Sequence, residues 1–171
     1  MKESLVFMGV AGCGKSTLAA AIAQGEGVEL IEGDAYHCDS NLQKMKSGVA
    51  LTDADRSGWL DVLANQLRAK SQGIVLTCSA LRLAYRDRLR LAAPGLRFVF
   101  MDIGRDDALA RVVARAATHF FSASLVDSQI ATLEPPIGEP GVLRVDATAP
   151  LPQLQAEVTA WIHRSDQERH V

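Results

Sequence analysis

Residues 9 to 16 read Gly9-Val10-Ala11-Gly12-Cys13-Gly14-Lys15-Ser16, and they fill every fixed position of the pattern G-x-x-x-x-G-K-[ST]. An apolar run stands directly before this segment, at residues 5–8, and a helical stretch follows it. The glycines let the backbone turn its N–H groups inward, and the helix N-terminus adds a positive dipole. A glycine-rich turn that binds nothing would not require all three features together. The segment therefore predicts a phosphate-binding loop between a strand and a helix.

Each part of this loop has an expected role in binding a nucleoside triphosphate. Lys15 is expected to reach the β- and γ-phosphates, and Ser16 to hold Mg²⁺. The other nucleotide contacts are expected from Gly9, Gly12, Cys13, Gly14 and Thr17. Cys13 stands near a helix N-terminus, where a thiolate is favoured, but an ordinary small loop residue is the better interpretation, because the sequence places no base beside it.

The size and charge of the chain limit its partners. It has 171 residues and a net charge of −2, from 18 lysines and arginines against 20 acidic residues. This length suits one domain, expected at residues 1–164 and followed by a polar tail at 165–171. The charge favours neither nucleic acid nor a membrane surface as partner, and no apolar run is long enough to span a bilayer. We therefore expect a small-molecule partner and a cytoplasmic protein, whose three cysteines, without metal-site spacing, are reduced.

Five apolar runs alternate with helical patterns along the chain. The expected strands are residues 5–8, 28–31, 73–78, 96–101 and 142–145, and the expected helices are 15–24, 53–69, 80–91, 106–116 and 151–163. Several runs carry apolar residues consecutively, as strands buried on both faces do. This order predicts an α/β fold with a parallel sheet flanked by helices. Asp53 and Asp106 are the expected N-caps of the second and fourth helices.

Polar residues follow the apolar runs, at the sheet edge where ligands of such folds bind. Glu32-Gly33-Asp34 follows the second run, and Ser79 follows the third. Asp34 is suited to accept a proton from a substrate hydroxyl, and Glu32 to bind Mg²⁺ through water. A solvated turn is the alternative for these acids, but their place beside the phosphate loop favours a function.

Several arginines also stand where an anion would be bound. Arg56 falls in the first turn of the expected helix 53–69, where a cation opposes the helix dipole, which indicates an anionic partner. Arg111 and Arg115 are four residues apart on one helix face. A solvated face explains this spacing, but in a phosphoryl transferase it delivers guanidinium groups to the nucleotide from a closing lid. His119 is weak evidence for substrate contact when taken alone.

Taken together, these motifs resemble the bacterial-type gluconate kinases (gluconokinases), a family of the P-loop kinase fold related to shikimate and nucleoside monophosphate kinases. The residues that carry the likeness are Met8-Gly9-Val10, Glu32-Gly33-Asp34, His37, Asn41, Lys44-Met45, Gly48, the run Leu51-Thr52-Asp53-Ala54-Asp55-Arg56, Trp59-Leu60, Cys78-Ser79-Ala80-Leu81, Tyr85-Arg86-Asp87, His119-Phe120-Phe121, Ser128-Gln129 and Thr132-Leu133-Glu134. Shikimate kinases share the phosphate loop and an acid–x–Asp segment, but not the segments 78–87 and 128–134. The likeness covers the chain from Phe7 to about Pro150.

The resemblance implies a three-layer P-loop kinase fold with a five-stranded parallel sheet and an arginine-bearing lid at about residues 111–134. It implies Lys15, Asp34 and Arg115 as catalytic residues, with Asp34 as the base. The sugar acid would be held by Asp34, His37, Arg56, Arg86, His119 and Gln129. Arg111 would lie against adenine, and Thr148, in the stretch 146–150, would form the other side of that pocket.

The chain departs from the family pattern at a few positions. Arg82 stands where the family usually has lysine, and Gly58 replaces a proline before Trp59. Residues 116–118 replace a shorter link, which shifts the register of the lid around Arg115.

The resemblance implies that the protein transfers the γ-phosphate of ATP, with Mg²⁺, to the 6-hydroxyl of D-gluconate, and that it forms a homodimer. Two alternatives are a kinase of another small hydroxy-acid, such as shikimate, and a nucleotide-dependent switch without transferase activity. The position of Asp34 at a strand end, beside an arginine-rich segment, favours the transferase over the switch.

Overall fold

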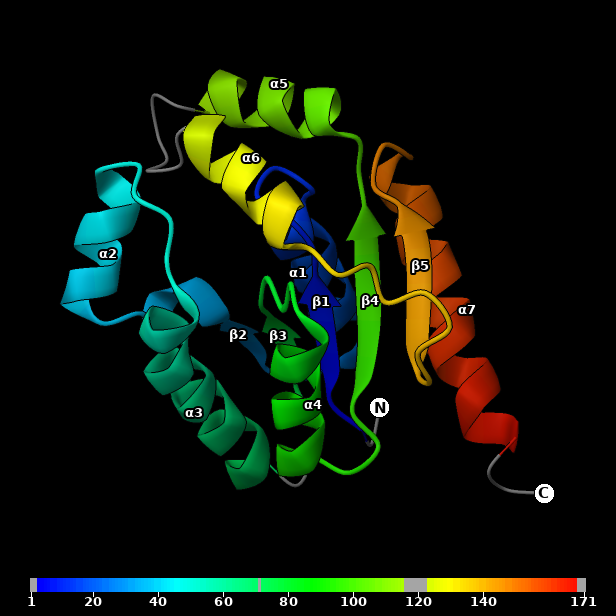
Figure 1. Ribbon diagram of the computed structural model, residues 1–171. Coiled ribbons are helices and arrows are strands. Elements are labelled where there is room, and N and C mark those ends of the chain that lie inside the picture. Colours follow the sequence, from blue (N-terminus) through cyan, green and yellow to red (C-terminus); the bar gives the residue numbers. More distant parts are fainter. Residues whose placement is uncertain (1–2, 71, 116–122, 169–171) are drawn as a thin grey trace.

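Five parallel strands form the centre of the structure, a computed structural model that describes residues 3–70, 72–115 and 123–168 (Figure 1). The strands are β1 (Leu5–Met8), β2 (Leu30–Glu32), β3 (Val75–Thr77), β4 (Arg97–Asp102) and β5 (Val142–Asp146), in the order β2-β3-β1-β4-β5. Phe7 of β1 stands opposite Thr77 of β3 on one side and Val99 of β4 on the other. The predicted five-stranded parallel sheet is confirmed.

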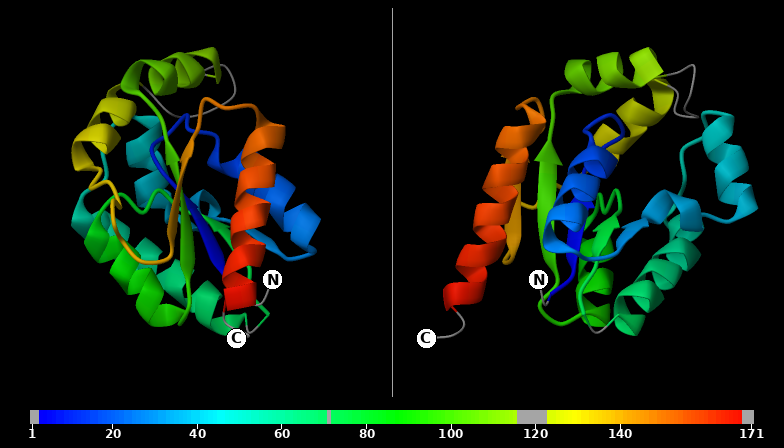
Figure 2. Two further views of the ribbon diagram at one scale, coloured as in Figure 1. Left: turned by 90° about the vertical axis from the view of Figure 1, so that its right-hand side faces the viewer. Right: turned by 180° about the vertical axis from the view of Figure 1, so that it is seen from behind.

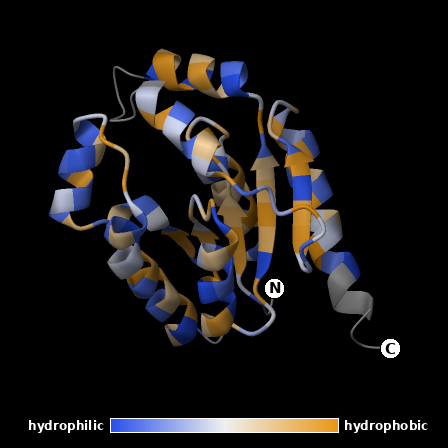
Figure 3. Ribbon diagram, viewed as in Figure 1, coloured by the Kyte–Doolittle hydropathy of each residue, from blue (hydrophilic) through white to orange (hydrophobic). Residues whose placement is uncertain are grey.

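Two layers of helices cover the sheet. Helices α1 (Lys15–Glu26) and α7 (Leu151–Glu168) lie on one face, and α3 (Asp53–Ala69) and α4 (Leu83–Ala92) lie on the other (Figure 2). Alternate residues of β1 serve the two layers: Val6 and Met8 pack under α3 and α4, whereas Leu5 and Phe7 pack under α1 and α7. Because both faces of the sheet are buried, consecutive residues of its strands are apolar, which is the pattern the sequence displays (Figure 3).

The remaining helices gather around the carboxyl edge of the sheet. They are the short 3₁₀ helix η1 (Gly33–Tyr36), α2 (Asp39–Lys46), α5 (Arg105–Arg115) and α6 (Ala123–Thr132). α5 crosses above the ends of the strands, and α6 runs below it toward α4 (Figure 1). Val10 and Ala11 of the phosphate loop pack with residues of α5 and α6 in a small separate cluster. Among the described helices, none has both the length and the apolar character needed to cross a membrane.

Several expected boundaries were wrong, for local reasons. The N-cap of α3 is Thr52 rather than Asp53: the Thr52 side chain accepts from the Asp55 N–H, and the Asp55 side chain accepts from the Thr52 N–H, forming a capping box. α5 begins at Arg105, so Asp106 lies inside its first turn and is not the cap. α4 begins at Leu83 rather than at residue 80, because Ala80 has a φ of 44°, outside the right-handed helical region.

Two helices and one terminus also differ from expectation. α2 was not predicted, because it buries only Asn41 and Met45 and shows no apolar stripe. α6 lies within the segment expected as a lid. α7 continues to Glu168, so most of the expected tail at 165–171 is helical, and residues 169–171 lie outside the described part of the chain.

Candidate active site

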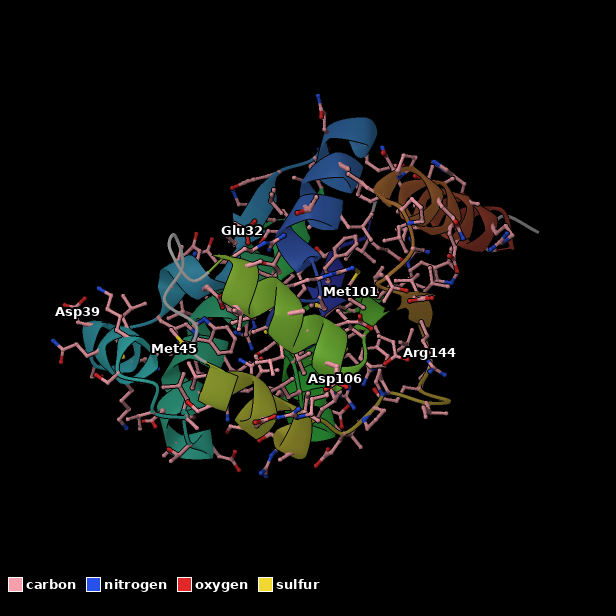
Figure 4. All side chains as sticks on the ribbon, turned by 90° about the horizontal axis from the view of Figure 1, so that it is seen from above. Glu32, Asp39, Met45, Met101, Asp106 and Arg144 are labelled. Atoms are coloured by element: carbon pink, nitrogen blue, oxygen red, sulfur yellow. The ribbon has the colours of Figure 1, made fainter. Side chains whose placement is uncertain are left out.

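The phosphate loop connects β1 to α1 and depends on glycine at two close approaches. Gly9 has a φ of 140°, and a Cβ built there would lie 2.8 Å from the Met101 carbonyl oxygen at the end of β4. Gly12 has a φ of 83°, and its Cβ would lie 2.6 Å from the Ala108 carbonyl oxygen of α5. Any larger residue would push the loop away from β4 and α5. Figure 4 looks down on this edge of the sheet and labels Met101.

Lys15 is held over the loop by backbone oxygens. Its ammonium nitrogen donates to the carbonyls of Gly9, at 3.0 Å, and Val10, at 3.1 Å. The side chain thereby lies in a cavity that we call the phosphate cavity. Its lining residues are Ala11, Gly12, Gly14, Lys15, Ser16, Asp34, Ser79, Val112, Arg115 and Gln129. The Asp34 side chain is 57% exposed, so its carboxylate is accessible to a ligand there.

A hydroxyl and a carboxylate meet beside the phosphate loop, with a second hydroxyl behind them. The Ser16 hydroxyl donates to Glu32 Oε2 at 3.0 Å, and the Thr77 hydroxyl donates to the same oxygen at 2.6 Å. Within the described residues no group of three or more His, Cys, Asp or Glu side chains could hold a metal ion. Mg²⁺ typically takes one or two protein oxygens and completes its shell with water and phosphate oxygens. Ser16 and Glu32 therefore fit a magnesium ion that arrives with a nucleotide.

A second cavity adjoins the first, and we call it the acceptor cavity. Its lining residues are His37, Met45, Ala50, Leu51, Arg56, Trp59, Ser79, Leu125, Ser128 and Gln129, so Ser79 and Gln129 line both cavities. Arg56 is only 7% exposed, and its guanidinium lies over the Tyr85 ring, 5.9 Å from the centroid. A buried cation that opens into a cavity is suited to a carboxylate ligand.

His37 lies in the wall of the acceptor cavity, stacked on Trp59. Its ring stacks on Trp59 with centroids 4.2 Å apart, and its Nε2 lies 3.9 Å from Asp34 Oδ1. Burial lowers the pKa of His37 below its usual value of 6.5; Asp34 opposes this shift and Arg56 adds to it. The Asn41 amide nitrogen lies 3.4 Å from Nδ1 and can only donate, so Nδ1 is the acceptor there and Nε2 is the ring nitrogen left to donate to a ligand hydroxyl.

The backbone before Asp34 is fixed on both sides. The Gly33 N–H donates to the Thr77 hydroxyl at 3.2 Å, and the Gly33 carbonyl accepts from the Trp59 indole at 2.7 Å. Because Gly33 is bound to both β3 and α3, the next residue, Asp34, has a defined starting position between the phosphate cavity and His37.

A third cavity lies on the far side of the phosphate loop, and we call it the base cavity. It is lined by Cys13, Gly14, Thr17, Leu18, Arg111, Arg115, Ala147, Ala149, Leu151 and Leu154. Arg111 donates to the Ala147 carbonyl at 3.0 Å and to the Gly12 carbonyl at 3.5 Å, which joins the two walls. Arg115 lines the base cavity and the phosphate cavity alike. Small apolar walls beside a guanidinium plane suit a planar base.

Two of the expected site residues, Arg86 and Thr148, do not line these cavities. Arg86 is 1% exposed, and it donates to the carboxylate of Glu139 and to the carbonyls of Ala80 and Glu134. Thr148 is exposed and binds the Asp146 carboxylate, at 2.6 Å from its hydroxyl, in a turn whose neighbours Ala147 and Ala149 form the wall instead. His119 lies outside the described residues.

Some residues that shape the site were noted in the sequence without being given a role in it. Ser79 lines both cavities, and its position after β3 was the available signal. Thr77 of β3 and Trp59 of α3 form hydrogen bonds with the backbone of Gly33. Asn41, which is 2% exposed, donates to the Asp55 carbonyl at 2.9 Å. These contacts join residues far apart in sequence, so no local pattern reports them.

Known proteins resemble this chain over most of its length. A family model described as "AAA domain" matches residues 5–136. A gluconokinase of Gluconobacter oxydans (strain 621H) is 46% identical over 145 residues, covering 82% of this chain and 80% of that protein. The thermoresistant gluconokinase of Escherichia coli (strain K12) is 38% identical, covering 93% of each chain. The crystal structure of a gluconokinase from Sinorhizobium meliloti 1021 superposes with a TM-score of 0.91 at 40% identity, covering 99% of this chain and 96% of that one.

Proposed function

This chain belongs to the gluconokinase family of P-loop kinases, and we propose that it transfers the γ-phosphate of ATP to the 6-hydroxyl of D-gluconate, giving 6-phospho-D-gluconate and ADP. The observation that carries the proposal is the adjacency of two cavities that share Ser79 and Gln129. One contains the phosphate loop, and the other contains a buried arginine and a buried histidine. A phosphoryl donor and a polyhydroxy acid bound in them would meet at Asp34.

Asp34 is the proposed base. Its exposed carboxylate, within 3.9 Å of His37 Nε2, stands where a hydroxyl from the acceptor cavity would enter the phosphate cavity. Phosphoryl transfer requires positioning and charge stabilisation more than covalent chemistry by the protein. Asp34 would orient the primary hydroxyl and take its proton as the oxygen attacks.

Charge on the transferred group is offset by cations on three sides. Lys15 reaches from the phosphate loop, and Arg115 from α5, where it lines both nucleotide cavities. Mg²⁺, held by Ser16 and through water by Glu32, would supply further neutralisation of the phosphate oxygens. Arg111 would lie against the adenine ring in the base cavity, whose other contacts come from Cys13, Gly14 and Thr17.

The acceptor is recognised by complementary charge and hydrogen bonding. Arg56 would pair with the carboxylate, and His37, Ser128 and Gln129 would bind the row of hydroxyls. The buried polar groups of such a site are left unpaired by an analogue that lacks the hydroxyls, which costs affinity. Arg86 is left out of this set, because its donors are engaged by Glu139 and by backbone carbonyls.

The family resemblance also bears on the oligomeric state of the protein. We expect a cytoplasmic homodimer in which residues 1–164 form one domain, as the family resemblance implies. Analytical ultracentrifugation at micromolar concentration measures the mass, and a species of about twice the chain mass of 18.4 kDa is expected.

The experiment is an ADP-release assay with Mg²⁺-ATP across D-gluconate, shikimate, glucose and nucleoside monophosphates, with the product identified by NMR. We expect D-gluconate to have the highest kcat/KM and its product to carry the phosphate on the 6-hydroxyl oxygen. Lys15→Ala is the control for the phosphate loop and should abolish turnover in a folded protein. Equal or better activity on shikimate or a nucleotide would overturn the gluconate proposal, and ADP release that ignores every acceptor would favour a switch.

A further inference from the structure

α6 stands between the phosphate cavity and the acceptor cavity and contacts both. Val126 packs in the cluster that contains Val10 and Ala11 of the phosphate loop. The preceding residue, Leu125, packs with Met45 and Leu51 on the acceptor side. Two neighbouring residues of one helix thus reach the walls of two different binding sites.

Polar contacts attach α6 on each side. Arg105 of α5 binds the Asp127 carboxylate with two nitrogens, at 2.7 Å and 3.0 Å. Ser124 donates to the Gly48 carbonyl, after α2, at 3.3 Å. Beyond the end of α6, the Glu134 carboxylate accepts from the Leu83 N–H at 2.7 Å. A shift of α6 would therefore change its contacts with α5 and with the segment that follows α2.

Gln129 is the polar link from this helix to the phosphate loop. The Ala11 N–H donates to Gln129 Oε1 at 2.7 Å, across 118 positions of sequence. A backbone N–H is only a donor, so the amide oxygen must face it, and this contact fixes the orientation of the amide. The Nε2 group is then the end of the amide that can donate to a ligand. Gln129 also lines the acceptor cavity.

We propose that Gln129 is a positioning residue that couples the acceptor cavity to the phosphate loop. A hydroxyl of the bound acceptor receives a hydrogen bond from Nε2, which holds the side chain with Oε1 on the Ala11 N–H and keeps the loop in its nucleotide-binding shape. The acceptor therefore tightens nucleotide binding, and by linkage the nucleotide tightens acceptor binding by the same factor. This inference rests on the proposed function for the identity of the acceptor.

The test is a binding cycle with ADP, which forms an unreactive complex with D-gluconate. Calorimetry measures the Kd of Mg²⁺-ADP with and without saturating D-gluconate. For the wild type we expect a ratio of about ten, within the usual range of coupling between sites. Gln129→Met keeps the length of the side chain but loses the amide, so its ratio should fall to about one. Thr132→Val is the matched control on the same helix, because its hydroxyl donates to the Ser128 carbonyl one turn earlier, and its ratio should equal that of the wild type.

Hydrogen exchange of the Ala11 amide, followed by NMR, gives a second readout that needs no acceptor. The amide should exchange about fivefold faster in Gln129→Met than in the wild type and in Thr132→Val, which is the effect of losing one hydrogen bond. D-gluconate should slow the exchange further in the wild type and in Thr132→Val, but not in Gln129→Met. A loss of overall stability would speed hydrogen exchange at amides throughout the protein, whereas the proposed link requires faster exchange at the phosphate loop.

The outcomes separate the two proposals. If the wild type phosphorylates D-gluconate but Gln129→Met keeps its binding ratio, or if the wild-type ratio is one, the coupling is overturned and the proposed function stands. If the wild type neither binds nor phosphorylates D-gluconate, the proposed function fails. The Ala11 exchange rates then decide alone: equal rates in wild type and Gln129→Met overturn the link between α6 and the loop.

Discussion

At the scale of single residues, adjacent positions have opposite requirements: Gly33 must lack a side chain, and Asp34 must supply one. A Cβ at Gly33 would lie 2.1 Å from the Thr77 carbonyl oxygen, so this position accepts no side chain without movement of β3 or η1. Asp34, the next residue, needs its side chain, which is the proposed proton acceptor. The tight packing of Gly33 on β3 is what places the Asp34 carboxylate beside the phosphate cavity.

Asp34→Asn tests the proposed base while keeping the shape of the side chain. We expect kcat to fall on the order of 10²-fold or more, because the amide cannot take the proton of the attacking hydroxyl. The Kd of Mg²⁺-ATP, measured by calorimetry on the same preparation, should change little. A variant with wild-type turnover would leave Asp34 as a turn residue without a catalytic role.

Gly33→Ala tests the close approach to Thr77. The added methyl group meets backbone rather than a flexible side chain, so we expect the free energy of unfolding to fall by about 2 kcal/mol, with a loss of activity through displaced Asp34. Gly58→Ala is the matched control, because nothing lies within 4 Å of its Cβ position in α3. Replacing that helical glycine should raise stability by up to about 1 kcal/mol. Urea unfolding measures both, and equal effects of the two substitutions would contradict the argument.

At the scale of elements, α4 anchors the segment that follows α6. Arg86 of α4 binds Glu139 and the Glu134 carbonyl, and Arg90 binds the same Glu139 carboxylate at 2.8 Å. Burial raises the pKa of Glu139, but the hydrogen bonds from Arg86 and Arg90 outweigh it and hold the pKa below its usual value. The three charged groups, Arg86, Arg90 and Glu139, therefore hold α4 to the chain leading to β5.

Arg86→Met separates this structural role from the substrate-binding role that the resemblance implied. Removing one partner of a buried ion pair leaves the other charge poorly compensated, so the free energy of unfolding should fall by about 3 kcal/mol. The KM for D-gluconate of the folded variant should change less than about threefold, well under the loss expected when a charged ligand contact is removed. Arg88→Met is the control on the same helix: Arg88 is half-exposed and pairs with exposed Asp61, so its loss should cost under about 1 kcal/mol. A large rise in KM confined to Arg86→Met would return this residue to the acceptor site.

At the scale of the whole molecule, the three thiols report on different parts of the fold. Cys13 and Cys78 are buried, and Cys38 is exposed at the start of α2. Burial raises the pKa of Cys78 to about 12, whereas the Ser40 hydroxyl and the Asn41 N–H lower the pKa of Cys38. Thiolates rather than thiols react with disulfide reagents, so exposure and pKa favour the same cysteine.

Labelling with an aromatic disulfide reagent at pH 7 should therefore show one fast thiol and two slow ones. Cys38→Ser should remove the fast phase and leave the slow phases unchanged. The slow phases should follow opening of the fold and accelerate with urea, because Cys78 packs in the core under α3 and α4. Two fast thiols in the native protein would show that the phosphate loop opens far more readily than its packing indicates.

The sequence by itself determined the parts of this protein that depend on neighbours along the chain. The phosphate loop was readable because its function needs glycines, a lysine and a hydroxyl at fixed spacing between a strand and a helix. The parallel sheet was readable because strands buried on both faces leave consecutive apolar residues, and Asp34 and Glu32 followed from their place at a strand end.

Only the tertiary structure decided which of two similar arginines lines the acceptor cavity. Arg56 and Arg86 both lie near the start of a helix and are both buried, but Arg56 opens into the acceptor cavity while Arg86 meets Glu139, 53 positions along the chain. In the same way α2 and α6 acquire their roles from Met45, Leu51 and Leu125, which meet only in the folded chain. The role of a charged side chain or of a short polar helix depends on the residues that pack against it. In a parallel sheet, long crossover connections bring those residues together from distant parts of the chain, so they leave no periodic signal in the sequence.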